Sequence, residues 1–107
     1  RDLGFGRIRL GAYYEPDLMA STATVTSVAQ NVASVVLLAS LSSRLGFRVF
    51  NDATADCYVK FGATASATSF TAMLEPGGYL EEDSYYGGVD ALWASAGAGS
   101  ARITSLT

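Results

Sequence analysis

The sequence predicts an all-β fold: an antiparallel β-sandwich of jelly-roll type, preceded by an extended N-terminal arm. Two observations lead to this class. Short stretches alternate between apolar and polar residues, and a period of two places one side of a strand inward and the other outward. Turn-forming residues separate these stretches at spacings of roughly 8–12 residues, which is typical of sandwiches and barrels. At 107 residues the chain is expected to form a single domain.

The first segment, residues 1–20, differs from the rest of the chain. Glycines at positions 4, 6 and 11 weaken a helix, and large apolar residues stand between them. We therefore predict an extended arm (residues 1–20) that lies on another surface, followed by a sandwich domain over 21–107. The candidate partner-binding residues of the arm are Leu3, Phe5, Arg7, Ile8, Arg9, Leu10, Tyr13 and Tyr14.

Arg7 and Arg9 stand two positions apart in the arm, so they share one face of an extended segment. Such a pair can bind a phosphate or the carboxylates of a partner subunit, and we favour the carboxylates.

Eight strands are expected in the sandwich. Phe47 and Val49 alternate with Arg48, and the same alternation recurs in the later stretches. The segment 32–45 is ambiguous, because it fits either a short buried helix or a strand buried on both faces. Its β-branched residues and flanking serines favour the strand. The predicted strands lie near 22–29, 34–40, 45–51, 56–62, 68–75, 78–82, 88–95 and 99–106.

Two turns can be predicted in detail. Residues 51–54, Asn-Asp-Ala-Thr, read as a turn, because Asn and Asp side chains bond their own backbone. Residues 76–78, Pro-Gly-Gly, fit a type II turn, in which proline presets φ at the second position and glycine accepts a positive φ at the third.

Composition limits the classes of partner. The net charge of −3 argues against nucleic-acid binding, which needs a basic face. No apolar run approaches the roughly 18 residues that span a membrane. Charged residues make up 16% of the chain, against roughly 25% in an average protein. A surface of Ser, Thr, Ala and Gly tends to be covered by another molecule, although a small monomer with a neutral surface is the alternative.

Catalytic chemistry is not expected, and neither is a cofactor or a metal. The chain has no histidine and a single cysteine, Cys57, which is expected to be a small buried apolar residue. The acidic run Glu81-Glu82-Asp83 reads as a solvated strand end that blocks edge pairing. A contribution to a Ca²⁺ site or to a glycosidase pair is the alternative, but alternation sends Glu81 and Glu82 to opposite faces.

The aromatic residues near the end of the chain form a second group of candidates. Tyr79, Tyr85 and Tyr86 are candidate partner-binding residues, and exposed aromatics of this kind can also stack on sugar rings. Trp93 is expected in the core, because a tryptophan in the penultimate strand commonly fills a small sandwich, and stacking on a sugar ring is the alternative for this residue too.

Several short motifs occur in an order that resembles a β-sandwich module of tailed-bacteriophage virion proteins. The resemblance covers residues 44–104. It rests on Arg44-Leu45-Gly46 with Asn51-Asp52, Cys57-Tyr58-Val59-Lys60-Phe61-Gly62, Thr68-Ser69-Phe70-Thr71, Pro76-Gly77-Gly78-Tyr79, Tyr86-Gly87-Gly88-Val89 and Leu92-Trp93-Ala94. Such modules occur in capsid decoration (cement) proteins and in head or tail fibres.

The resemblance implies a structural role, no catalysis and symmetric assembly. The expected function is a decoration protein on the capsid surface of the virion. Its expected partners are the major capsid protein and further copies of itself, with a trimer favoured. The alternative is a fibre or appendage domain that binds host carbohydrate.

Overall fold

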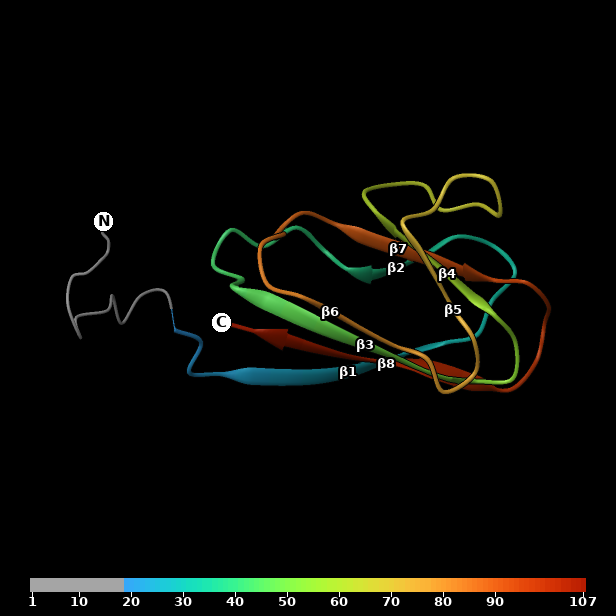
Figure 1. The fold of residues 1–107 in the computed structure, drawn as a ribbon, viewed down its shortest axis with the longest axis horizontal. Coiled ribbons are helices and arrows are strands. Elements are labelled where there is room, and N and C mark those ends of the chain that lie inside the picture. The colour runs from blue at the N-terminus through green and yellow to red at the C-terminus, as the bar shows by residue number, and fades with distance from the viewer. Residues whose placement is uncertain (1–18) are drawn as a thin grey trace.

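The computed structural model describes residues 19–107 as eight strands in two four-stranded sheets that face one another (Figure 1). Sheet I has the strand order β1-β8-β3-β6, and sheet II has the order β2-β7-β4-β5. All pairings between these strands are antiparallel. The strands are β1 (Ala23–Ala29), β2 (Val35–Leu38), β3 (Gly46–Ala53), β4 (Cys57–Phe61), β5 (Ala72–Leu74), β6 (Tyr79–Glu82), β7 (Val89–Trp93) and β8 (Gly99–Leu106).

The connectivity is that of a jelly roll. The first strand pairs with the last, β2 with β7, β3 with β6, and β4 with β5, so the chain folds as four nested antiparallel pairs. Successive pairs alternate between the two sheets, which gives the two packed layers of that architecture. The predicted all-β sandwich of jelly-roll type is confirmed. Residues 1–18, which make up most of the predicted arm and include all of its candidate residues, lie outside the described residues.

The core lies between the two sheets and follows the alternation seen in the sequence. In β3, Phe47 and Val49 face inward and are fully buried, whereas Phe50 is exposed on the outer side of sheet I. Trp93 of β7 is 1% exposed, which confirms its predicted place in the core. Cys57 is likewise fully buried, and this burial raises the pKa of its thiol to about 12.

The ambiguous segment 32–45 forms a strand, β2, as favoured from its β-branched residues. The type II turn is also confirmed: the amide of Gly78 donates to the carbonyl of Glu75 at 2.7 Å, and Gly77 has a φ of 86°. The predicted strand 68–75 is shorter, because Ser66 and Ser69 exchange backbone hydrogen bonds in a local turn and leave only Ala72–Leu74 in the sheet.

The predicted turn at 51–54 is wrong at its start. Asn51 and Asp52 continue β3, which runs to Ala53. The side chain of Asn51 does not bond its own backbone but donates to the carbonyls of Ala55 and Leu74, at 2.9 and 2.8 Å. These partners hold it inside the sandwich, so the turn begins only after Ala53.

Within residues 19–107 no helix is long and apolar enough to cross a membrane.

Candidate interaction surfaces

A sandwich has four edge strands, and three of them in this structure are blocked by features that discourage pairing with another chain. β5 has three residues and β2 has four, with a register shift between Val36 and Leu38. β6 has four residues and carries the acidic run at its end. Short strands, irregular register and charge are the usual means by which native sheets protect their edges.

The fourth edge, β1, has none of these features. Its seven residues, Ala-Thr-Val-Thr-Ser-Val-Ala, carry no charge and no proline. They pair with β8 in unbroken register from Ala23 opposite Leu106 to Ala29 opposite Ser100. The ribbon shows β1 in blue along the margin of sheet I, beyond β8 (Figure 1). A long, regular and uncharged edge is a template for adding an extended segment of another chain.

β1 is also exposed on both of its faces. Six of its residues are exposed, and Val25, on the outer face, is 65% exposed. On the inner face, Thr26 lies opposite Ile103, which is fully buried in β8, but Thr26 itself remains exposed. The sandwich is therefore open along β1.

This opening contains a groove of about 450 Å³. Its walls come from the inner face of β1, the end of β8, the last residue of β2 and the loop that joins β2 to β3. Small hydroxyl side chains and a few apolar residues dominate the lining, which comprises Thr24, Thr26, Leu38, Ala39, Ser40, Leu41, Ser43, Arg44, Ser105 and Thr107.

Among the described residues that line the groove, Arg44 alone has a charged side chain, and it is 4% exposed. Its guanidinium donates to the carbonyls of Ala39 and Gly87 and, at 3.4 Å, to the hydroxyl of Ser105. It also lies 5.9 Å from the ring centroid of Phe47, a cation–π distance. Burial lowers the pKa of Arg44, since desolvation disfavours its charged form. Among residues 19–107, none of the ion pairs includes Arg44.

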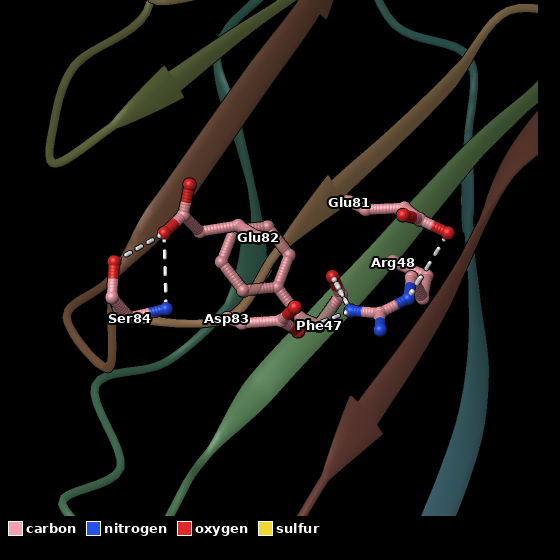
Figure 2. A network of polar contacts seen from close by, with 6 residues as sticks. All are labelled: Phe47, Arg48, Glu81, Glu82, Asp83 and Ser84. Carbon is pink, nitrogen blue, oxygen red and sulfur yellow. Dashed lines mark hydrogen bonds and ion pairs between the residues drawn. The ribbon is translucent and has the colours of Figure 1, made fainter.

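The acidic run at the end of β6 is paired with an arginine of the neighbouring strand (Figure 2). Arg48 of β3 contacts Asp83 at 2.9 Å and Glu81 at 3.6 Å. The hydrogen bond from Arg48 to Asp83 raises the pKa of the guanidinium. Glu81 and Asp83 are exposed, so the predicted solvated strand end is confirmed.

Glu82 points away from this pair, as alternation predicts, and accepts two hydrogen bonds from Ser84 (Figure 2). The Ser84 hydroxyl lies 2.6 Å from the Glu82 carboxylate and the Ser84 amide 3.0 Å, and these bonds lower the pKa of Glu82. The described part of the chain contains no group of three or more Cys, Asp or Glu side chains arranged to hold a metal ion.

The three candidate tyrosines do not form one surface. Tyr79 is 56% exposed at the start of β6, opposite Phe50 of β3. Tyr86 is equally exposed but follows the other end of β6, where its carbonyl accepts a hydrogen bond from the Leu41 amide. Tyr85 is half-buried: its ring stacks on Phe61 at 4.8 Å, and its hydroxyl donates to the carbonyl of Gly88.

The groove and its arginine are the features that sequence reasoning missed. Thr24 and Thr26 occupy inward positions of a strand where large apolar residues are the norm, and this is the local signal for an open edge. The burial of Arg44 has no comparable signal, because two of its acceptors, Gly87 and Ser105, lie 43 and 61 positions away.

No protein-family model, no curated protein and no solved structure matches this chain.

Proposed function

We propose that the protein is a bacteriophage virion protein that decorates the outer capsid shell and stabilises it. The observation that carries the proposal is the open edge of β1, which is long, regular and uncharged in a sandwich whose other edges are short, irregular or acidic. Such an edge suits attachment to an extended segment of a neighbouring protein. The motif order described for residues 44–104 supports a virion protein as the class.

The mechanism is one of mass action. A protein that binds only the assembled shell stabilises that shell by the free energy of binding, and many symmetric copies multiply the effect. The major capsid protein is the proposed partner, and the arm supplies further contacts to the shell or to a sister copy. Self-association of closed symmetry, with a trimer favoured, would cover exposed edges on every copy.

Apolar burial and backbone hydrogen bonds should dominate this attachment. The ion pairs seen in the described residues join Arg48 to Glu81 and Asp83, at and just beyond the end of β6, and Arg102 to Asp52 within sheet I, so these charges are already paired inside the protein. Such binding should persist at about 1 M salt, where the Debye length falls to about 3 Å.

Co-sedimentation with purified tailed-phage capsids that lack their own decoration protein tests the proposal. We expect the protein to pellet with the shells at a saturating, symmetric copy number, and to stay bound at high salt. Failure to pellet at any salt concentration would reject the decoration role. Release by moderate salt alone would reject the proposed mode of attachment and indicate an electrostatic one.

A carbohydrate-binding fibre domain is the second candidate. It is favoured by the exposed aromatic pair Tyr79 and Phe50, which lie opposite one another on the outer face of sheet I. Binding to a glycan panel, lost on Tyr79→Ala, would support this candidate. With Trp93 buried and Tyr85 packed on Phe61, two of the four aromatic residues considered for sugar stacking are engaged in the fold.

A further inference from the structure

The backbone of β1 directs a row of hydrogen-bonding groups away from its sheet. Just beyond the two ends of β1, Thr22 and Thr107 exchange two backbone hydrogen bonds, of 2.9 and 3.4 Å, and the amide of Gln30 donates to the carbonyl of Gly99 at 3.0 Å. Hydrogen-bonded and non-hydrogen-bonded pairs alternate along an antiparallel ladder. The even-numbered residues of β1 therefore bond β8, and the N–H and C=O groups of the odd-numbered residues point outward. These residues are Ala23, Val25, Ser27 and Ala29.

The outward groups meet no strand within the described part of the chain. β1 is an edge of sheet I, and among residues 19–107 it pairs with β8 alone. An unpaired row of this kind is a template for the backbone of another strand. The direction and register in which a second strand fits are set by the spacing of these groups and by the side chains of β1.

We propose that the edge of β1 pairs antiparallel with the β1 edge of a second copy of this chain, about a twofold axis that passes beside Thr26. In this register Val25 lies opposite Ser27 of the second copy, and Ala23 lies opposite its Ala29. Each of these is a hydrogen-bonded pair, so every outward N–H and C=O of β1 finds a partner. The two copies of sheet I then form one continuous antiparallel sheet.

The side chains of β1 suit this pairing on both faces of the joined sheet. Val25 meets Ser27 on the outer face, and Thr26 meets Thr26 of the second copy on the inner face, where paired threonines stabilise a ladder. The register also keeps inward residues inward, which a shift by one residue would not do. Because β1 carries no charge, the twofold axis brings no like charges together. The acidic edge of β6, in contrast, would face a copy of its own carboxylates.

Pairing of β1 with itself closes at two copies. The edge is then used on both chains, whereas a ring of three needs two different surfaces on each chain. The other edges, β2, β5 and β6, are short, irregular or acidic, so they offer no regular template for a third copy. This dimer does not depend on the capsid role. If a capsid segment also adds to β1, it has to displace the second copy, because both use the same backbone groups.

Sedimentation of the purified full chain over a dilution series, without capsids, tests the dimer. We expect a monomer–dimer equilibrium. Val25→Pro removes one outward N–H and leaves the hydrogen bonds to β8 in place, so it should stay folded by circular dichroism and be monomeric where the parent is dimeric. Val25→Thr keeps the N–H and is the matched control, which should dimerise like the parent. A parent that is monomeric at its highest soluble concentration, or trimeric, would overturn the proposal, as would a folded Val25→Pro variant that still dimerises.

Disulfide trapping tests the register without removing a hydrogen bond. Thr26 lies opposite its own copy in a non-hydrogen-bonded pair, with a Cα separation of about 4.5 Å that a disulfide can span. Oxidation of Thr26→Cys should therefore give a covalent dimer, and the buried Cys57 should not compete. Thr24→Cys is the control on the same face: its two copies would stand four positions apart along the strand, roughly 13 Å, and should not crosslink. Crosslinking of Thr24→Cys as readily as Thr26→Cys, or of neither, would contradict the twofold register.

Discussion

The indole nitrogen of Trp93 donates a hydrogen bond of 3.0 Å to the side-chain carbonyl of Asn51, so the largest core residue of sheet II is tied to a buried amide of sheet I. The amide nitrogen of Asn51 donates to Ala55 and Leu74, and its backbone bonds Gly77 and Gly78. One residue thus joins β3, β7, the end of β5 and the turn that leads into β6. Because every polar atom of this side chain has a partner, its burial stabilises one arrangement of the two sheets.

Asn51→Asp should destabilise the protein strongly at neutral pH. The substitution replaces a donor of two hydrogen bonds with a buried carboxylate, and an uncompensated buried charge costs about 3–5 kcal/mol. Burial would raise the pKa of the new carboxyl above its unfolded value of about 3.9, so the loss of stability should appear as the pH rises through 4. Urea unfolding at pH 7 and at pH 4 measures this difference.

Asp52→Asn is the matched control for that substitution. Asp52 is exposed and pairs with Arg102 at 3.0 Å, and exposed pairs of this kind contribute about 0–1 kcal/mol. A loss of stability for Asn51→Asp no greater than that of the control would show that Asn51 does not hold the sheets together.

Gly77→Ala should destabilise the fold through the backbone alone. Gly77 has a φ of 86°, and a Cβ placed there would meet no atom within 4 Å, so sterics with neighbours play no part. A left-handed conformation costs a non-glycine residue about 1–2 kcal/mol. Gly77→Asn should lose less, because asparagine tolerates this region. Equal melting temperatures for the parent and Gly77→Ala would contradict the turn assignment.

The buried thiol of Cys57 should make stability depend on alkaline pH. Its pKa in the folded protein is about 12, against 9.0 for an ordinary thiol, so the folded state holds the proton more tightly. The resulting stabilisation is complete below pH 9 and is lost as the pH rises toward 12. The variant Cys57→Ala, although less stable overall, should lack this part of the pH dependence. If the free energy of unfolding falls equally with pH in the parent and in Cys57→Ala, the pKa of the Cys57 thiol is not raised by folding.

Deletion of residues 1–17 should leave a folded sandwich that binds its partner more weakly. Among residues 19–107, the buried core cluster lies between Leu37 and Ile103, and the first strand begins at Ala23. Circular dichroism should retain its β signal, whereas co-sedimentation with capsids should weaken, because the contacts proposed for the arm are lost. If the β signal disappears, the deleted residues belong to the core.

The strands could be predicted from the sequence because their signals are local. Phe47 and Val49 alternate with polar neighbours, and the sequence around Pro76 and Gly77 encodes its own turn geometry. The predicted turn at Asn51 was wrong because an asparagine side chain can hydrogen-bond either its own turn or a distant carbonyl. Only the packed fold brings the carbonyl of Leu74 within reach of this side chain. The burial of Arg44 depends on hydrogen-bond acceptors that lie far from it in the chain, so no short stretch of sequence predicts this burial.

The exposed tyrosines illustrate the same limit. Tyr79, Tyr85 and Tyr86 are close in sequence and chemically alike, yet β6 separates the first from the other two. Stacking on Phe61 then turns Tyr85 into a packing residue. Their different surroundings depend on sheet register and on the loop between β6 and β7, which residue type alone does not specify.

The most direct test of the central claim is capsid binding by an edge variant. Val25→Lys adds a charge to the open edge of β1, and edge lysines block strand addition. Met73→Lys adds the same charge to an exposed position of β5, on the other sheet, and serves as the control. We predict that Val25→Lys abolishes co-sedimentation with capsids while Met73→Lys binds like the parent, both variants remaining folded. Capsid binding by a folded Val25→Lys variant at the parent's affinity would contradict attachment through β1.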